Sequence, residues 1–443
     1  MNEEAYQGFI QGAQQLGSMA RPVEMPDEQR VKNARDIYLA NLDGAMAVDL
    51  ESCVHCGMCA EACHFYVSTK DPKYTPIRKL DLLKRIYRRE LSPMRWLHRL
   101  YTRDITVDDL REFEELVYDS CTECGRCSTI CPMGIHIAGM VNVNRQAMTA
   151  AGLGPAELRA MDQEQCDHES VFGVGKDQFL AALENLREQG LDVPLDKPKA
   201  EVMITTSVLD IALTVDALVS TVKIMNHTGR DWTFRSEGYE SANFGMLLGD
   251  EETQACASRK LIDAAVACEA KIVVTAECGH GYTAMRWDSA NSYGKPLPFK
   301  VMAISEFMGN EIREGRLKLK KLDKKVVAWH DPCKVGRIGG SFQEPRDVIE
   351  ALGLELHETE SSGPTNFCCG GGAGVFLINR AADLRHKAFQ LKQNEIDNTG
   401  AKTMIVSCGS CRMNFENGKH RSNWDMSIES LVELVGENLD ESA

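Results

Sequence analysis

The sequence Cys-Thr-Glu-Cys-Gly-Arg-Cys-Ser-Thr-Ile-Cys-Pro occupies residues 121–132, and its four cysteines are separated by two, two and three residues. A second run with the same separations begins at Cys53 and ends at Cys63, followed by His64. In tight loops of this kind three thiolates wrap one iron–sulfur cubane, while the fourth reaches a neighbouring cluster. The two runs therefore predict a small domain built around two [4Fe–4S] clusters.

The crossover of the fourth cysteine defines the predicted ligand sets. We assign Cys53, Cys56, Cys59 and Cys131 to one [4Fe–4S] cluster, and Cys121, Cys124, Cys127 and Cys63 to the other. The alternative is a pair of zinc ribbons, because these also use Cys-x2-Cys knuckles. Zinc needs four ligands in two separated pairs, whereas each run here holds four closely spaced cysteines, so the ferredoxin pattern fits better. We expect this domain to carry electrons.

The segment between the two runs, residues 70–103, is strongly basic. It holds eleven Lys or Arg against three acids, and Leu80, Leu83, Ile86 and Tyr87 recur at helical spacing. The pattern predicts an amphipathic helix with a basic face. One interpretation is a solvated helix packed on the cluster domain, since charged side chains usually face water. The other is a docking site for an acidic partner or anionic lipid.

The rest of the chain alternates β-branched runs with helical stretches, which is typical of α/β folds. Leu377, Ala381, Leu384, Ala388 and Leu391 are predicted to share one helix face, with Gly400 as a stop. The predicted strands are Val202–Thr206, Ile272–Ala276, Val326–Trp329 and Met404–Ser407. Three of them end near a cysteine: Cys278, Cys333 and Cys408. Ligands bind beyond the carboxyl ends of such strands, so we expect a site there.

A third cysteine pattern lies in this region. Thirty-four residues separate Cys333 from the pair Cys368-Cys369, and 38 residues separate that pair from Cys408-x2-Cys411. The alternatives are a buried thiol pair and, for Gly370–Gly374, a phosphate-binding loop. No strand precedes these glycines and no acidic residue follows at the dinucleotide-site position, so we interpret them as allowing close backbone approach to a cluster.

A degenerate copy of the pattern lies upstream, because residues 272–281 parallel residues 404–411. Aligning residues 235–238 with residues 367–370 puts Ser236 and Glu237 at the positions of the cysteine pair. The same comparison puts Gly281 at the position of Cys411. The first half is therefore expected to keep the fold without a cluster.

Only Cys278 remains of a ligand set in that half, and His280 follows it closely. We expect both near the intact site as substrate-side groups, the alternative being plain packing of a hydrogen-bonded histidine. Cys256 and Cys268 lie outside every motif and are expected to pack as small apolar residues, and Cys166 is equally uninformative.

The composition limits the remaining classes of function. The chain has 443 residues and a formal charge of −15, which argues against nucleic acid binding. No stretch approaches the roughly 18–20 apolar residues of a membrane helix, and no export signal opens the chain. Clustered cysteines without such a signal favour metal ligation in the cytoplasm. The expected divisions are an N-terminal segment 1–45, a cluster domain 46–155, a helical linker 156–198, a degenerate half 199–322 and an intact half 323–443.

The five-cysteine pattern with His330-Asp331-Pro332 before it resembles the CCG motif found in the B and D polypeptides of heterodisulfide reductase. A ferredoxin domain fused to it, from about Ala47 to Leu434, resembles the D polypeptide. It also resembles the K subunit of the sulfite-reductase-linked membrane complex, its counterpart in the cytochrome c3 transmembrane complex, and B2-type subunits of soluble Hdr-like complexes. The resemblance implies a noncubane [4Fe–4S] cluster held by Cys333, Cys368, Cys369, Cys408 and Cys411. Two-cluster relatives split a disulfide between two such clusters, whereas this chain has ligands for one.

The expected fold is α+β and α/β, a helical 2x[4Fe–4S] ferredoxin domain followed by a duplicated α/β CCG domain. The resemblance implies an oxidoreductase subunit acting on sulfur groups, which exchanges electrons between partner carriers and a thiol or disulfide, either a small thiol or a sulfur-carrier protein. A haem b membrane subunit or a flavin subunit is the expected partner, the latter because the chain has no flavin fingerprint. Attachment to the inner membrane face would then run through a partner. The alternatives are a pure electron-transfer subunit between a flavoprotein and quinone, and a scaffold with a vestigial site.

Overall fold

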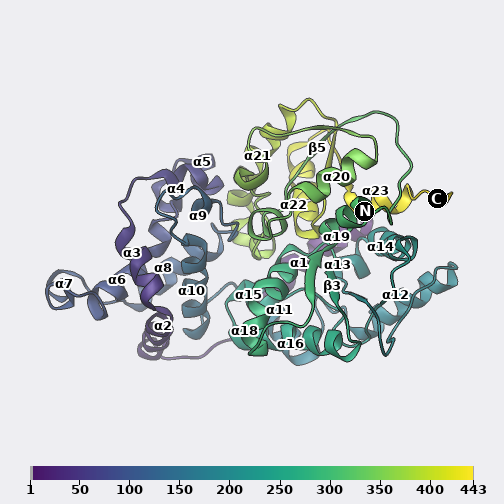
Figure 1. The fold of residues 1–443 in the computed structure, drawn as a ribbon. Coiled ribbons are helices and arrows are strands. Elements are labelled where there is room, and N and C mark those ends of the chain that lie inside the picture. Colours follow the sequence, from purple (N-terminus) through teal and green to yellow (C-terminus); the bar gives the residue numbers. More distant parts are fainter. Residues whose placement is uncertain (1–2, 443) are drawn as a thin grey trace.

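The computed structural model describes residues 3–442 and contains a helical domain beside two α/β halves (Figure 1). The helical domain lies at one end of the molecule, and both chain ends lie at the other. Its long helix α10 (Ile137–Ala150) packs against α2 (Asp27–Asn41) and α8 (Val107–Tyr118). Its other helices are α3 (Gly44–Ser52), α4 (Met58–Ala62), α5 (His64–Thr69), α6 (Asp81–Glu90), α7 (Arg95–Tyr101) and α9 (Arg126–Ile130).

Each α/β half contains a four-stranded, fully parallel sheet. The first sheet has the order β2-β1-β3-β4 and the second β6-β5-β7-β8, so the order within each half is the same. This repetition confirms the predicted fold class, a helical cluster domain followed by a duplicated α/β domain. The strands are β1 (Val202–Ile204), β2 (Trp232–Thr233), β3 (Ile272–Thr275), β4 (Lys300–Ala303), β5 (Val326–Trp329), β6 (Glu355–His357), β7 (Thr403–Val406) and β8 (Ser427–Ser430).

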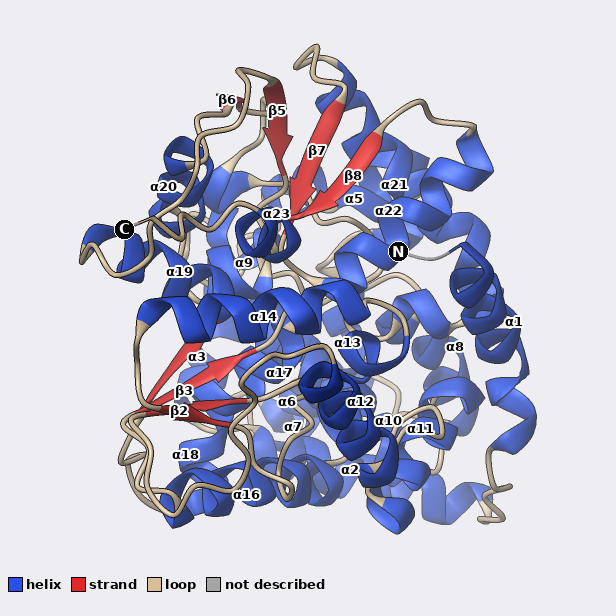
Figure 2. Ribbon diagram, turned by 90° about the vertical axis from the view of Figure 1, so that its right-hand side faces the viewer, coloured by secondary structure: helices blue, strands red, loops and turns tan. Residues whose placement is uncertain are grey.

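Helices between the two sheets join the halves into one body (Figure 2). In this layer α14 (Val215–Thr228) packs against α23 (Leu431–Glu437), and α19 (Ile304–Arg313) packs against α20 (Gln343–Ala351). A continuous apolar core runs through the layer and includes buried side chains from both sheets, such as Val274 and Ile405. The remaining helices of the halves are α13 (Val208–Ala212), α15 (Phe244–Leu248), α16 (Glu251–Ala267), α17 (Gly279–Thr283), α18 (Ser289–Tyr293), α21 (Ala382–Asp397) and α22 (Gly409–Ser422).

The N-terminal helix α1 (Glu3–Met19) does not stay with the helical domain. It packs against α11 (Ala156–His168), and Gln14 accepts a hydrogen bond from the side chain of Asn379 in the second half. Helix α12 (Lys176–Glu188) then leads into β1. Among residues 3–442, no helix combines the length and the apolar character needed to cross a membrane.

The four predicted strands are present, and four short edge strands were not predicted. The predicted helix face at the C-terminal end is wrong in detail. Leu377 and Ala381 precede α21 in short 3-10 turns, and the buried face of the helix includes the predicted Ala388 together with residues that were not predicted, among them Phe389 and Lys392. Polar residues take these buried positions because Lys392 pairs there with Glu395, which the apolar periodicity alone could not indicate.

Candidate metal centre

The first cysteine run and the last cysteine of the second run line one cavity of about 90 Å³. Gly57 begins α4 in the left-handed conformation, with a φ of 81°, which allows the loop to turn tightly around the cavity. Lys84 of α6 also lines this cavity and contacts His55 at 2.9 Å. The four cysteines on its wall are Cys53, Cys56, Cys59 and Cys131.

A second, smaller cavity of about 30 Å³ lies beside the other cysteine run. Gly125 begins α9 with a φ of 76°, so the two loops turn in the same way. His64 is buried on the wall of this cavity, next to Cys124. The four cysteines here are Cys63, Cys121, Cys124 and Cys127. The fourth cysteine of each run therefore faces the loop of the other run, which is the arrangement that two adjacent cubanes need.

The third group consists of five buried cysteines at the carboxyl ends of β5 and β7. Cys333 precedes the π-helical turn η4 (Lys334–Ile338), Cys408 precedes α22, and Cys411 lies in its first turn. Cys368 and Cys369 lie in the loop that follows the short turn η5 (Gly363–Thr365). All five belong to one apolar cluster of side chains. The fold thus gathers residues that are up to 78 positions apart in the sequence, from Cys333 to Cys411.

His330 lies among these sulfurs and was not among the predicted site residues. It is buried, and neither ring nitrogen has a hydrogen-bond partner among the residues that the structure describes. One of these nitrogens lies within 4.8 Å of the Cys369 and Cys411 sulfurs. Burial lowers the pKa of His330, which favours the neutral ring. Five buried thiols beside an unsatisfied imidazole are a donor set that fits an iron–sulfur group.

Glycines let the backbone approach this site closely. A Cβ on Gly371 would lie 2.8 Å from the Cβ of Asn414, and a Cβ on Gly374 would lie 2.7 Å from Leu158 Cδ2. Asn414 in turn donates a 2.6 Å hydrogen bond to the carbonyl of Cys369. These contacts fix the loop that carries the adjacent cysteines, so the glycines have a packing role here.

The cubane loop around Cys124 touches the five-cysteine group directly. The sulfurs of Cys124 and Cys368 are in contact, and this contact holds the pKa of Cys124 well below its usual range. Arg337 Nη1 donates to the carbonyl of Cys124 at 2.7 Å, and Arg126 Nε donates to the carbonyl of Thr365 at 2.6 Å. The two cysteine loops are therefore held together by arginine side chains from both sides.

Arg145 of α10 is fully buried and joins all three parts of the molecule. Its guanidinium donates to the carbonyls of Val117 and Cys121 in the helical domain, at 3.1 and 2.8 Å. It also donates to Leu247 of the first half at 2.6 Å and to Ala373 of the second half at 2.8 Å. The position of the cubane loop relative to both halves depends on this side chain.

At the place where the intact half carries cysteines, the degenerate half is filled by its own backbone and side chains. Glu237 is exposed and bonds to Lys176, whereas Ser241 lies next to Cys278, so the predicted alignment of Ser236 and Glu237 with the cysteine pair is wrong. The lack of side-chain similarity left the register of this loop undetermined. A Cβ on Gly281 would lie 2.1 Å from the carbonyl oxygen of Ser241. A cysteine therefore does not fit at residue 281 without backbone movement.

Cys278 and His280 do lie near the intact site. The Cys278 sulfur lies 3.6 Å from His280 Nε2, and a Cβ on Gly279 between them would lie 3.7 Å from the Cys408 sulfur. Burial raises the pKa of the Cys278 thiol and lowers the pKa of His280 to about 4. Both groups are thus neutral at pH 7, a protonated thiol beside an unprotonated imidazole.

Two carboxyl groups are buried in the same region. Burial raises the pKa of Glu240 to about 8 and that of Glu277 to about 8. Glu240 accepts a hydrogen bond from the backbone of Ala242, and Glu277 accepts one from the hydroxyl of Ser430. Each has one carboxyl oxygen without a partner among the described residues. Sequence reasoning missed both, because isolated acids in a degenerate motif give no signal.

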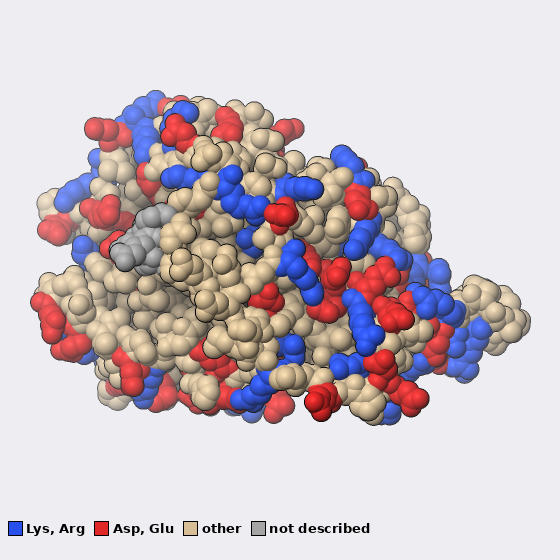
Figure 3. All heavy atoms as spheres, turned by 180° about the vertical axis from the view of Figure 1, so that it is seen from behind, with Lys and Arg blue, Asp and Glu red and all other residues tan. Residues whose placement is uncertain are grey.

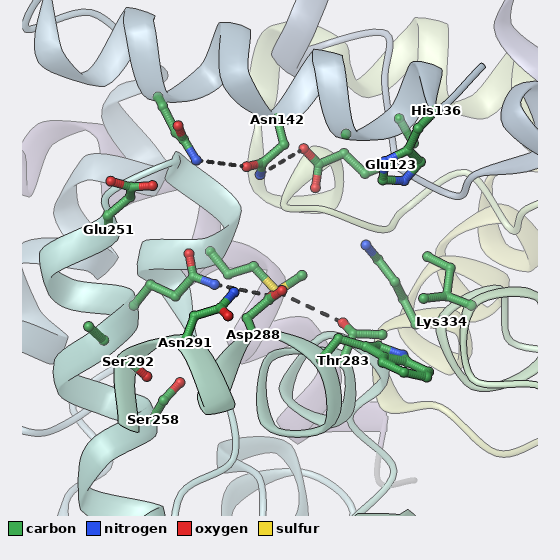
Figure 4. Close-up of a pocket in the computed structure, with 18 residues that line it drawn as sticks. Glu123, His136, Asn142, Glu251, Ser258, Thr283, Asp288, Asn291, Ser292 and Lys334 are labelled. Atoms are coloured by element: carbon green, nitrogen blue, oxygen red, sulfur yellow. Dashed lines mark hydrogen bonds between the residues drawn. The ribbon is translucent and has the colours of Figure 1, made fainter. Parts of the chain in front are cut away.

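A cleft of about 640 Å³ lies between the helical domain and the first half (Figure 4). Glu123, between two cysteines of the cubane loop, lies on one wall, and Asp288 lies on the opposite side. Lys334, next to Cys333, points its amino group into the cleft. Lys334 is only 9% exposed, and no carboxylate pairs with it among residues 3–442. Much of the remaining wall is amide or hydroxyl, including Asn142, Gln254 and Ser258.

A smaller cavity of about 70 Å³ lies on the other side of the site. Cys278, His280 and Ser410 line it together with aromatic side chains, among them Phe9 of α1 and Phe244. It is mainly apolar. The isolated cysteines take no part in these sites: Cys268 is buried as predicted, but Cys256 is exposed, so its predicted packing role is wrong, and Cys166 is exposed too.

Comparison with known proteins agrees with this geometry. Residues 49–135 match the family model of the 4Fe-4S dicluster domain, and residues 327–416 match that of the cysteine-rich CCG domain. The chain is 26% identical to the D polypeptide of the dihydromethanophenazine:CoB--CoM heterodisulfide reductase of Methanosarcina barkeri, over 92% of this chain and 98% of that protein. The chain contains a 4Fe-4S dicluster domain and a cysteine-rich CCG domain. These similarities support an iron–sulfur redox subunit.

Other relatives carry different names. The chain is 23% identical to the Hdr-like menaquinol oxidoreductase iron-sulfur subunit 2 of Archaeoglobus fulgidus, over 88% of this chain and 80% of that protein. It is 26% identical to the EtfAB:quinone oxidoreductase of Syntrophomonas wolfei, over 88% of this chain and 56% of that protein. These three relatives are thus named as oxidoreductases or their subunits.

Proposed function

We propose that this subunit exchanges electrons with a thiol or disulfide substrate at a noncubane [4Fe–4S] cluster held by the five buried cysteines. One observation carries the proposal: Cys333, Cys368, Cys369, Cys408 and Cys411 gather in one apolar cluster, with the cubane-loop residue Cys124 against Cys368. Bound there, the cluster would supply single electrons to a sulfur substrate. Reduction of a disulfide consumes two electrons and two protons and yields two thiols.

The order of the cysteine groups along the molecule supports a path for these electrons. Cys56 is exposed at the end where the helical domain meets solvent, whereas the cysteines of the third group are buried. Between them lies the group around Cys121 and Cys124, whose loop touches the third group through Cys368. We infer that a partner exchanges electrons with the protein at the Cys56 end. The sulfur substrate would exchange electrons with it at the buried end. A haem b or flavin subunit is the expected partner.

The substrate is proposed to approach through the large cleft. The cleft is wide enough for a small thiol or the end of a carrier arm, and its amide and hydroxyl side chains can bond a polar, amide-bearing molecule. Lys334 joins the cleft to Cys333 and is suited to an anionic group on the substrate. The smaller cavity has a mainly apolar lining, which does not suit such a polar molecule.

The second candidate is electron transfer between a flavoprotein and quinone, with no sulfur substrate. The names of the Archaeoglobus fulgidus and Syntrophomonas wolfei relatives, which mention menaquinol and quinone, favour it. The cavity beside Cys278 is the feature of this chain that favours this candidate. Its apolar lining suits a quinone better than it suits a polar thiol.

The test is a comparison of anaerobically purified protein with the Cys369→Ala variant, and with Cys256→Ala as a matched control. We expect about twelve irons per chain in wild type and control, if all three sites hold [4Fe–4S], and about eight in Cys369→Ala. Electron paramagnetic resonance of the oxidised protein is expected to give a signal that changes when thiols are added, and only when Cys369 is present. About eight irons in wild type, or unchanged quinone-linked turnover in Cys369→Ala, would overturn the proposal in favour of the second candidate.

A further inference from the structure

Helix α7 lies at the far end of the helical domain (Figure 1), and a group of apolar side chains on and just before it is exposed. Trp96 is 69% exposed and Leu100 is 77% exposed. Leu91, Met94 and Tyr101 are exposed as well. Large apolar residues are normally exposed singly, and such a concentration over eleven residues marks an interaction surface. We define the α7 surface as these five residues together with Arg88, Arg95 and Arg99.

The helix itself is amphipathic, but its apolar side faces outward. Trp96 and Leu100 lie four residues apart and share one face, while Arg95 and Arg99 share another. In a helix that packs on its own domain the apolar face would be buried. In α7 no residue is buried. The preceding helix α6 provides the contrast, because its Leu82, Leu83, Ile86 and Tyr87 are all buried in the domain.

The charges of the α7 surface are opposite in sign to the rest of the protein. The chain carries a formal charge of −15, yet Arg88 and Arg95 form no ion pair with a carboxylate among the described residues. Arg99 is exposed and pairs with Glu90 at 2.5 Å. Figure 3 shows Lys and Arg side chains next to the uncharged tip of this end of the molecule. An anionic surface would repel the acidic rest of the protein. The end that carries the α7 surface is therefore the one suited to approach an anionic surface.

We propose that the α7 surface docks on a bilayer that contains anionic lipids. Tryptophan and tyrosine beside arginine are the composition that settles at the headgroup level of a membrane, with the apolar face inserted and the cations at the phosphates. The surface is short, so binding is reversible and needs both contributions. Cys56 lies in the same domain, so docking would bring the exposed cysteine group to the membrane face. This inference stands whether or not the substrate is a thiol.

The test uses the full chain with its clusters and vesicles of phosphatidylcholine, with or without an equal share of phosphatidylglycerol. Wild type is expected to sediment with the anionic vesicles in about 0.1 M salt and to be released from them in about 0.5 M salt. It should not sediment with the neutral vesicles. The double variant Trp96→Asp, Leu100→Asp should lose at least about tenfold in partitioning, and so should Arg88→Glu, Arg95→Glu. Val215→Asp, at another exposed apolar residue, is the matched control and should bind like wild type.

Two results would overturn the proposal. If wild type binds neither kind of vesicle, the α7 surface meets a protein partner with an acidic face instead. If the variant Trp96→Asp, Leu100→Asp binds anionic vesicles as tightly as wild type does, the contact with the membrane lies elsewhere. Because both residues are exposed and contribute nothing to the core, iron content and thermal midpoint should match wild type, which separates lost docking from misfolding.

Discussion

Arg337 Nη1 donates a 2.7 Å hydrogen bond to the carbonyl oxygen of Cys124, and so joins the turn after Cys333 to the second cubane loop. The same guanidinium donates to the carbonyls of Pro364 and Asn366, just before the adjacent cysteine pair. One side chain thus holds three segments that carry cysteines of two different groups. Electron transfer depends steeply on such spacing, so this contact should control the rate of transfer.

Replacing Arg337 by methionine should slow electron transfer between the two groups without removing a ligand. The variant loses the hydrogen bond to Cys124, and the loops are expected to separate slightly. We expect iron content within error of wild type and a roughly tenfold slower appearance of the thiol-sensitive signal in rapid-freeze measurements, about 1.4 kcal/mol in barrier. Arg111→Met, at an exposed arginine, is the control. An unchanged rate would show that the contact does not limit transfer.

Replacing Cys131 by serine should affect the cluster of the other loop. Cys131 is the last cysteine of the second run but lines the cavity of Cys53, Cys56 and Cys59. In the reduced protein we expect loss or alteration of the signal of that cluster, while the Cys121 cluster persists. Resonance spectra of Cys131→Ser and Cys63→Ser should therefore be complementary. Identical spectra for the two variants would contradict the crossover.

The Gly371→Ala variant should lose the third cluster although no ligand is changed. Its new methyl group would lie 2.8 Å from the Cβ of Asn414, whose side chain holds the carbonyl of Cys369. The expected result is an iron content about four lower than wild type. Gly12→Ala, in a helix with open space around it, should keep all its iron. Full iron content in Gly371→Ala would mean that the loop can yield by several tenths of an ångström.

The Glu240→Gln variant should remove part of the pH dependence of stability. The pKa of Glu240 is raised from 4.5 to about 8, so between these values the folded state keeps a proton that the unfolded state has lost. Stability therefore falls as the pH rises through this window. The variant should be more stable than wild type at pH 8 by about 1–3 kcal/mol, and nearly equal at about pH 4.5. Thermal unfolding across this window measures the effect, and parallel curves would contradict the role of Glu240.

Filling the large cleft should raise KM for a thiol substrate and leave the clusters intact. Ala255 is half-buried and lines the cleft from α16, on the first half, so Ala255→Trp should obstruct it without touching a cysteine loop. We expect KM to rise about tenfold with little change in kcat, because the loss is in binding. Lys334→Gln should raise KM for anionic substrates only. Equal KM values in Ala255→Trp and wild type would place substrate entry elsewhere.

Much of the fold was predictable because cysteine spacing and β-branched runs are local signals. The strands that precede Cys278, Cys333 and Cys408 were found in this way, and their carboxyl ends do carry the site. The edge strands β2 and β6 are only two and three residues long, too short for a recognisable pattern. The register of the degenerate loop around Glu237 failed because nothing chemical remained there to align.

The residues that connect the parts were beyond sequence reasoning. Arg145, Arg337 and Lys334 act through backbone carbonyls or a cavity contributed by distant segments, and such partners leave no pattern in one sequence. His330 lies three residues before a predicted ligand, yet only the fold brings its ring to Cys369 and Cys411. Buried polar side chains that bridge domains can be found only once the tertiary structure is known.

The buried guanidinium of Arg145 has a consequence for how the molecule melts. It bonds carbonyl groups of the helical domain and of both α/β halves, so no part can detach without leaving a buried cation unsatisfied. Heating should therefore give one calorimetric transition for the whole chain instead of separate ones for each part. Oxygen damage at the cubane loop, whose Cys121 carbonyl accepts from the same side chain, would then weaken the distant sheets as well.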